Sequence, residues 1–160
     1  MTPLADLVLS DARRFFSVDY LPKIERCLAA LDEDDVWWRA NPASNSIGNL
    51  VLHLDGSTRM WVVGIAGGRT VARDRASEFA ERGPIAKEIL LTRLRATLAE
   101  VDATLAGLNG DTLLERRKSS REEVTVLWAI LHSVEHFAMH TGQIILIAKQ
   151  RAGADLKLSS

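Results

Sequence analysis

Apolar side chains recur at helical spacing along four long segments of the chain. The first segment runs from about Pro3 to Leu31. Its apolar positions follow one another at intervals of three, four and seven residues: Leu4, Leu7, Val8, Phe15, Val18, Ile24, Leu28 and Leu31. Pro22 lies inside this segment. Because proline lacks the backbone N–H that a helix uses and clashes with the preceding turn, we expect a kink near Asp19 to Leu21.

The second helix is predicted from about Ile47 to Ala66. An acidic turn, Asp32 to Asp35, leads toward it, and Ser46 is suited to cap its first turn. The dipeptide Gly67-Gly68 ends it, because glycine readily takes the left-handed conformation found at helix C-termini. The next stretch, Arg69 to Arg82, alternates charges without an apolar face, so we expect a solvated loop there.

The third and fourth helices complete the pattern. The third runs from Pro84, a residue suited to a first turn, to about Leu108. A polar stretch from Glu115 to Arg121 separates it from the fourth, which runs from about Glu122 to Arg151. No alternating strand pattern occurs. The sequence therefore predicts an all-α fold, a four-helix bundle with residues 1–160 in one domain, and leaves the order of the helices open.

Composition excludes several classes of partner. Twenty basic and twenty-one acidic residues leave a net charge of −1, so we expect no nucleic-acid partner. No signal segment and no apolar run of about eighteen residues occurs, so we expect no membrane partner. The single cysteine, Cys27, cannot form an intramolecular disulfide and lies among apolar helical positions. It is therefore expected to be a packed, inert thiol in a cytoplasmic protein.

Four histidines carry the candidate chemistry. His132, His136 and His140 follow one another at steps of four residues, which places them on one face of a helix. His132 and His140 cannot hold the same ion, because about 12 Å separates their Cα atoms. Adjacent members can share one, and His53 is the only histidine elsewhere that can supply a third ligand. Spacing alone leaves the pair open: His132 with His136, or His136 with His140.

Two other metal motifs fit the sequence poorly. The stretch from His132 to His136 reads HxxEH, the inverted zinc-peptidase pattern in which the glutamate is general base. That family takes a further glutamate ligand well downstream, and no glutamate follows Glu135 here. A di-iron bundle requires a glutamate three residues before a histidine, and no histidine in the chain has one. We therefore expect Glu135 either to be solvated or to contact a metal ligand without contacting the metal itself.

Two stretches resemble the DinB/YfiT-like family of bacterial four-helix-bundle metalloenzymes. They are residues 45–54, NSIGNLVLHL, and residues 132–144, HSVEHFAMHTGQI. In that family a histidine of the second helix and an HxxxH pair before a Gly-Gln dipeptide bind the metal. The resemblance extends over nearly the whole chain and implies His53, His136 and His140 as the ligands.

The same resemblance implies a cofactor and a chemistry. The ion would be nickel, zinc, manganese or iron, and the protein a homodimer. Characterised members carry out transfer or isomerisation with a low-molecular-weight thiol such as bacillithiol or mycothiol. His132 would then lie one turn from the ligands. It either supports the ligands or faces the substrate, or it is a hydrogen-bonded residue of the core. Gln143 either orients His140 or bonds in the bundle interior, and Asp55 faces away from His53.

Three hypotheses about function follow. The first is a metal-dependent enzyme, a thiol S-transferase or a hydrolase, that acts on a small molecule through an open three-histidine site. The second is a non-catalytic stress-response or binding module with a structural or vestigial metal. The third is an interaction protein with exposed tryptophans. Tryptophans at helical spacing are more often core, which is what we expect of Trp37, Trp38, Trp61 and Trp128. Arginine pairs such as Arg73 and Arg75 are expected to be solvated.

Overall fold

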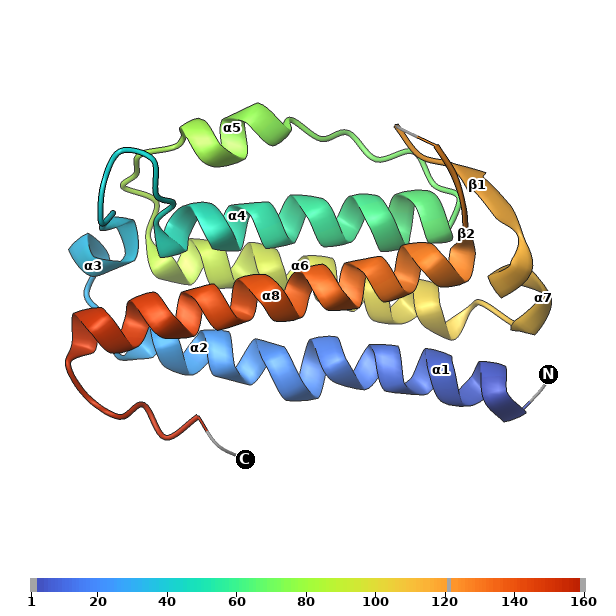
Figure 1. The fold of residues 1–160 in the computed structure, drawn as a ribbon, viewed down its shortest axis with the longest axis horizontal. Helices are drawn as coiled ribbons and strands as arrows, with labels where there is room; N and C mark the ends of the chain where they lie inside the picture. The colour runs from blue at the N-terminus through green and yellow to red at the C-terminus, as the bar shows by residue number, and fades with distance from the viewer. Residues whose placement is uncertain (1–2, 121, 159–160) are drawn as a thin grey trace.

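Four long helical rods lie side by side in the computed structural model, which describes residues 3–120 and 122–158 (Figure 1). The first rod comprises α1 (Pro3–Arg14), the π-helical segment η1 (Phe15–Tyr20) and α2 (Leu21–Ala29). The second comprises α4 (Ile47–Thr58) and the π-helical segment η2 (Arg59–Ala66). The third and fourth are α6 (Lys87–Ala106) and α8 (Val126–Ala152). The predicted all-α four-helix bundle is confirmed.

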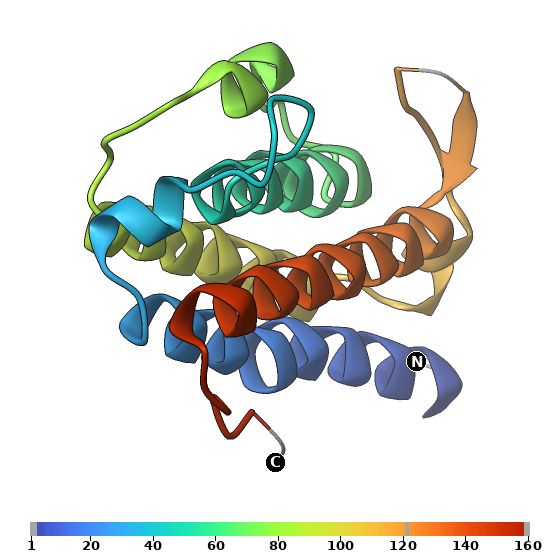
Figure 2. The same ribbon diagram turned by 60° about the vertical axis from the view of Figure 1, so that its left-hand side comes forward.

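The path of the chain sets the direction of each rod, which the sequence left open together with the order of the helices. The first rod and α8 run in one direction, and α4 and α6 run in the other (Figure 1). Because α4 and α6 are parallel, the chain between them, residues 67–86, returns along the length of the bundle. This crossover segment carries a short helix, α5 (Arg75–Ala80), across α4 (Figures 1 and 2).

The ends of the long helices follow the capping signals. The Ser46 hydroxyl accepts a hydrogen bond from the Asn49 backbone N–H at 3.1 Å, and the two residues form a capping box. Gly68, with φ of +67°, takes the left-handed conformation just after η2. Gly153, with φ of +61°, does the same after α8, while the Thr125 hydroxyl caps the beginning of that helix.

Pro22 affects the first rod as a local change of winding. It is the second residue of α2, and the six residues of η1 that precede α2 wind as a π-helix. A π turn leaves room where the proline ring would crowd the turn before it. The disturbance expected near Asp19 to Leu21 therefore includes the whole of η1.

Several short elements differ from the expectations. The acidic turn is the helix α3 (Glu33–Trp37), and the stretch expected to be a loop contains α5. The third helix begins at Lys87 and not at Pro84. Another short helix, α7 (Gly110–Leu114), precedes an antiparallel hairpin of β1 (Arg116–Lys118) and β2 (Glu123–Thr125). Elements of three to six residues are too short to show a period in the sequence, so the pattern missed them.

The core lies along the bundle axis between the four rods. Phe16 and Phe137 are fully buried and meet edge to face, with ring centroids 5.4 Å apart. Cys27 is buried in the same core, and burial raises the pKa of its thiol to about 11, as expected for a packed, inert thiol. Within residues 3–120 and 122–158, no helix is both long and apolar enough to span a membrane.

Candidate metal centre

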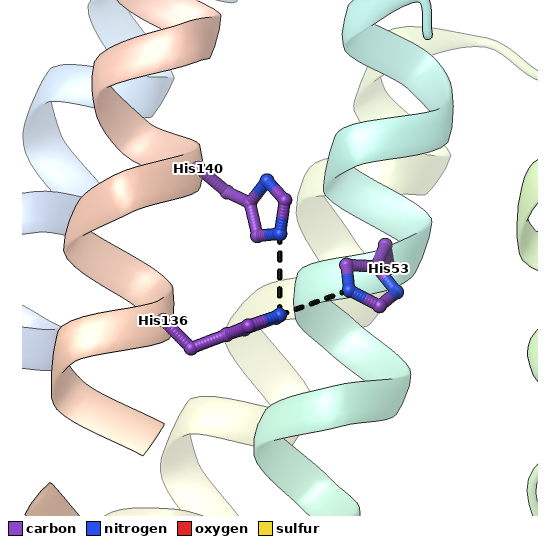
Figure 3. A group of neighbouring side chains, drawn as sticks. All are labelled: His53, His136 and His140. Atoms are coloured by element: carbon purple, nitrogen blue, oxygen red, sulfur yellow. Dashed lines mark hydrogen bonds between the residues drawn. The ribbon is translucent and has the colours of Figure 1, made fainter. Parts of the chain in front are cut away.

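Three histidines from two helices meet in the bundle. Figure 3 shows His53 on α4 facing His136 and His140 on α8. The Nε2 atom of His136 lies 3.0 Å from Nε2 of His53 and 3.2 Å from Nε2 of His140. One nitrogen from each ring lies within 4.8 Å of the others. The structure thus brings together the three residues that the family resemblance implies as ligands.

Two of these separations, from His136 to His53 and from His136 to His140, suit a shared ion. Imidazole nitrogens bind zinc at about 2.0–2.1 Å, so two of them lie about 2.9 Å apart at a right angle and about 3.4 Å apart at a tetrahedral angle. The observed 3.0 Å and 3.2 Å fall between these limits. The donor set of three imidazoles also matches the ligands that divalent transition metals prefer.

The other ring nitrogens of two histidines are held by side chains. Nδ1 of His53 lies 2.8 Å from Glu78 Oε2, and Nδ1 of His140 lies 2.6 Å from Gln143 Oε1. A carboxylate and an amide oxygen can only accept, so a proton on each Nδ1 satisfies both contacts. Arg73 Nη2 also lies 3.2 Å from Nδ1 of His53, and with Nδ1 protonated it donates to Glu78 Oε2 at 2.9 Å instead. Each Nε2 atom then presents a lone pair toward His136, as a ligand must.

Glu78 is itself held by an arginine. Arg73 Nε donates to Glu78 Oε1 at 2.7 Å, and Arg73 Nη2 donates to Oε2 at 2.9 Å. Both side chains are largely buried, with 13% of Arg73 and 8% of Glu78 exposed. Burial alone would raise the pKa of Glu78, but hydrogen bonds from Arg73 and His53 bring it below its usual value. The carboxylate is therefore ionised and can hold the proton of His53 Nδ1.

The crossover segment delivers Glu78 to α4. Helix α5 begins at an Asp74 cap and packs on α4, where Gly56 allows a close approach: a Cβ at this position would overlap Glu78 Oε1. Asn49 fixes the segment from below, because its Nδ2 donates to the carbonyl of Glu78 at 2.8 Å and to that of Glu81 at 3.0 Å. Asn49, the partner of Ser46 in the capping box of α4, therefore also anchors the segment that reaches His53.

The electrostatics favour the neutral form of two ligand candidates, His136 and His140. Burial, with the nearby His140 and His53 rings, lowers the pKa of His136 to about 3. Burial also lowers the pKa of His140, although its bond to Gln143 opposes the change. Neutral imidazoles have free lone pairs at neutral pH, which metal binding requires.

The other sequence candidates take separate places. Asp55 accepts a hydrogen bond from Thr97 Oγ1 at 2.5 Å and is not part of the cluster. Glu135 is solvated, with 82% of its side chain exposed. His132 lies one turn from His136, with ring centroids 5.9 Å apart, and is 28% exposed. It is therefore not a core residue.

The tryptophans meet the expectation of core positions only in part, because Trp37 and Trp61 pack against the core while partly buried. None of the four is fully buried, and Trp128 is 43% exposed. Trp61 and Trp128 pack with His132 beside the centre, whereas Trp38 lies under the Arg151 guanidinium. An exposed indole that a neighbouring ring covers on one side still gains contact area, so helical spacing alone could not separate it from the core.

Glu78 and Arg73 are the residues that sequence reasoning missed. The charge alternation of residues 69–82 predicted a solvated loop, and Arg73 was expected to be solvated with it. The useful signal was local: Asp74 followed three residues later by Ser77 is a capping pattern for a short helix. It indicates α5, but it does not show which face α5 turns toward His53.

The chain matches known proteins in family and in fold. A family model described as mycothiol-S-transferase matches residues 18–153. The crystal structure of a DinB-like protein from Bacillus subtilis is similar, with a TM-score of 0.69 and 16% identity, over 91% of this chain and 94% of that one. A conserved protein from Enterococcus faecalis gives a TM-score of 0.68 and 15% identity, over 96% and 98% of the two chains. No curated protein matches the chain.

Proposed function

The chain belongs to the mycothiol-S-transferase family of DinB-like proteins, and on this basis we propose that it is a metal-dependent thiol S-transferase. The ligands would be His53, His136 and His140, and the ion nickel, zinc, manganese or iron. The observation that carries the proposal is the meeting of three Nε2 atoms at 3.0 Å and 3.2 Å around His136. Among the described residues the group comprises these three ligands, and three ligands leave positions for a substrate on the ion.

The side chains of this protein would prepare the site for a thiol. Glu78 and Gln143 hold the rings of His53 and His140, so two lone pairs are aimed before any ion arrives. The low pKa of His136 keeps its ring neutral near neutral pH, so an ion would not have to compete with an imidazolium charge there. A bound divalent ion lowers the pKa of a thiol and so supplies a thiolate sulfur at that pH.

The burial of the three rings sets the side of approach. His53 and His140 are 4% and 9% exposed, whereas His136 is intermediate. Packed side chains therefore exclude water around two of the ligands, and the thiol and its electrophilic partner would enter beside His136. The family description favours mycothiol as that thiol. We place the protein in the cytoplasm, because thiols are kept reduced in that compartment.

One comparison tests the proposal. Untagged wild type, His53→Ala and His136→Ala are assayed for metal by plasma mass spectrometry and for conjugation of mycothiol to iodoacetamide or 1-chloro-2,4-dinitrobenzene. Glu135→Gln, a change at an exposed position, is the matched control. We expect about one ion per chain and metal-dependent conjugation in wild type and control, and neither in the histidine variants, with helical content unchanged.

Other outcomes would redirect the assignment. Metal without conjugation, using mycothiol or bacillithiol, would favour the non-catalytic binding module. Hydrolysis of an ester without any thiol would favour the hydrolase, because a bound water would then be the nucleophile. Absence of metal after incubation with nickel, zinc, manganese and iron would overturn both enzymatic versions.

We also propose that the protein is a homodimer with residues 1–160 as one domain. Phe15 on η1 and Leu131 on α8 are 39% and 53% exposed, and together with Val8 and Val134 they line a cavity of about 170 Å³. An apolar surface of this kind is typical of a contact between chains. Sedimentation velocity should show a dimer for wild type and a monomer for Leu131→Lys. Monomeric wild type would contradict the proposal.

A further inference from the structure

Exposure rises along α8 from the histidine cluster toward solvent. His140 is buried, His136 is intermediate, the His132 side chain is 28% exposed and Trp128 is 43% exposed. These residues follow one another at steps of four, so they form one row that turns about 40° around the helix with each step. Because His53 and His140 are buried while His136, His132 and Trp128 are more exposed, the outer part of this row is the most accessible part of α8 beside the cluster.

The outer part of the row is built from aromatic rings. The rings of Trp128 and His132 are stacked, with centroids 4.8 Å apart and planes at 9°. Trp61 on η2 meets both edge-on, with centroids 4.6 Å from His132 and 5.5 Å from Trp128. We call these three residues the aromatic wall. His132 links it to the cluster, because its ring centroid is 5.9 Å from that of His136.

We propose that the aromatic wall binds a planar, conjugated group of the electrophilic substrate. This inference rests on the proposed transferase function and names the class of its acceptor. Flat π-systems stack on aromatic rings that are not fully covered, and Trp128 and His132 remain 43% and 28% exposed although they stack on each other. One helical turn, about 5.4 Å, separates His132 from His136, so a ring on the wall keeps an attached reactive carbon near the cluster.

The reaction with such a substrate can be written in full for 1-chloro-2,4-dinitrobenzene. The thiolate sulfur forms a bond to the ring carbon that carries chlorine, and the carbon–chlorine bond breaks. Chloride leaves with the bonding electron pair, and the thiol proton passes to solvent. No oxidant or reductant is needed. The nitroarene ring lies on the wall, and the aliphatic electrophile iodoacetamide has no ring to place there.

Equilibrium binding tests the wall without any turnover. The unreactive probe is 2,4-dinitrotoluene, titrated into metal-free protein and followed by ligand-observed NMR. Trp128→Leu keeps an apolar side chain but removes the π-face, and Trp38→Leu, which makes the same change in size at a residue under Arg151, is the matched control. We expect Trp128→Leu and Trp61→Leu to weaken binding about three- to tenfold, the range of one aromatic pair, and Trp38→Leu to leave it unchanged.

Kinetics separate this inference from the proposed function. In the metal-loaded enzyme, Trp128→Leu should lower kcat/KM for 1-chloro-2,4-dinitrobenzene about three- to tenfold and leave that for iodoacetamide unchanged. If neither electrophile reacts, the transferase proposal fails, while the NMR titration still decides the wall. Three results would overturn the role of the aromatic wall. The first is that wild type and Trp128→Leu bind 2,4-dinitrotoluene equally well, and the second is that wild type binds methylcyclohexane as tightly as 2,4-dinitrotoluene. The third is that wild type binds glucose in place of the nitroarene and that this binding depends on Trp128.

Discussion

At the scale of single residues, Glu78 is expected to set metal affinity without touching the metal. Its carboxylate accepts a hydrogen bond from His53 Nδ1, which makes that ring a stronger ligand. Glu78→Gln keeps the shape but replaces the charged acceptor with a neutral one. Metal affinity, measured by competition with a chelator, should fall about 10- to 100-fold. Glu135→Gln should leave it unchanged, and equal affinity of the two variants would remove the role from Glu78.

The metal-free protein should lose stability in mild acid. An unfolded histidine has a pKa of about 6.5, whereas His136 in the folded chain has a pKa of about 3. Between these values the unfolded chain binds more protons, so the free energy of unfolding decreases as the pH falls. From pH 6.5 to pH 5 the loss is on the order of 2 kcal/mol. Urea titrations at both pH values measure it, and His136→Gln should show a smaller loss.

Two of the histidines were predictable because their spacing of four residues is that of a helix face. Glu78 has no such regular spacing relative to His53, the residue that it contacts. His136 and His140 share one helix at a spacing that the sequence displays, and the family motif added His53. Glu78 is 25 positions from His53 along the chain. It reaches that ring only because the crossover segment returns over α4, a tertiary fact that local charge alternation does not contain.

At the scale of elements, the contact between α5 and α4 depends on one glycine. Gly56→Ala would place a Cβ against Glu78 Oε1 and 3.1 Å from Arg73 Nε, which should displace α5. Metal affinity should then fall about as in Glu78→Gln. Gly142→Ala is the matched control, because a Cβ there meets nothing within 4 Å. It should raise the free energy of unfolding by about 0.5–1 kcal/mol and leave chelator competition unchanged.

The long helices could be read from the sequence and the short elements could not. Ser46, Gly68 and Gly153 mark helix ends through local backbone chemistry, which needs no knowledge of the fold. Helix α5 and the strands β1 and β2 are each shorter than two full repeats of an apolar pattern. Their stability comes from what they pack on, so their sequences alone resemble loops.

At the scale of the whole molecule, metal binding should stabilise the fold. The ligands come from α4 and α8, so an ion would cross-link two rods that are distant in sequence. At a free metal concentration 100 times Kd the gain is about 2.7 kcal/mol. For a domain of this size that corresponds to a Tm increase of roughly 5–10 °C. Calorimetry with and without metal should show it for wild type and not for His53→Ala, and an equal increase in both would place the ion elsewhere.

The unequal burial of the three histidines also concerns the rate at which an ion is exchanged. An arriving ion meets His136 first, and it then binds two rings that are already held in place by Glu78 and Gln143. A departing ion has to break all three bonds while external chelators reach it from one side only. Exchange should therefore be slow after folding is complete. If the protein binds a metal, the element in purified protein would then record which ion was abundant while the chain was made, and not which one the three imidazoles hold most tightly.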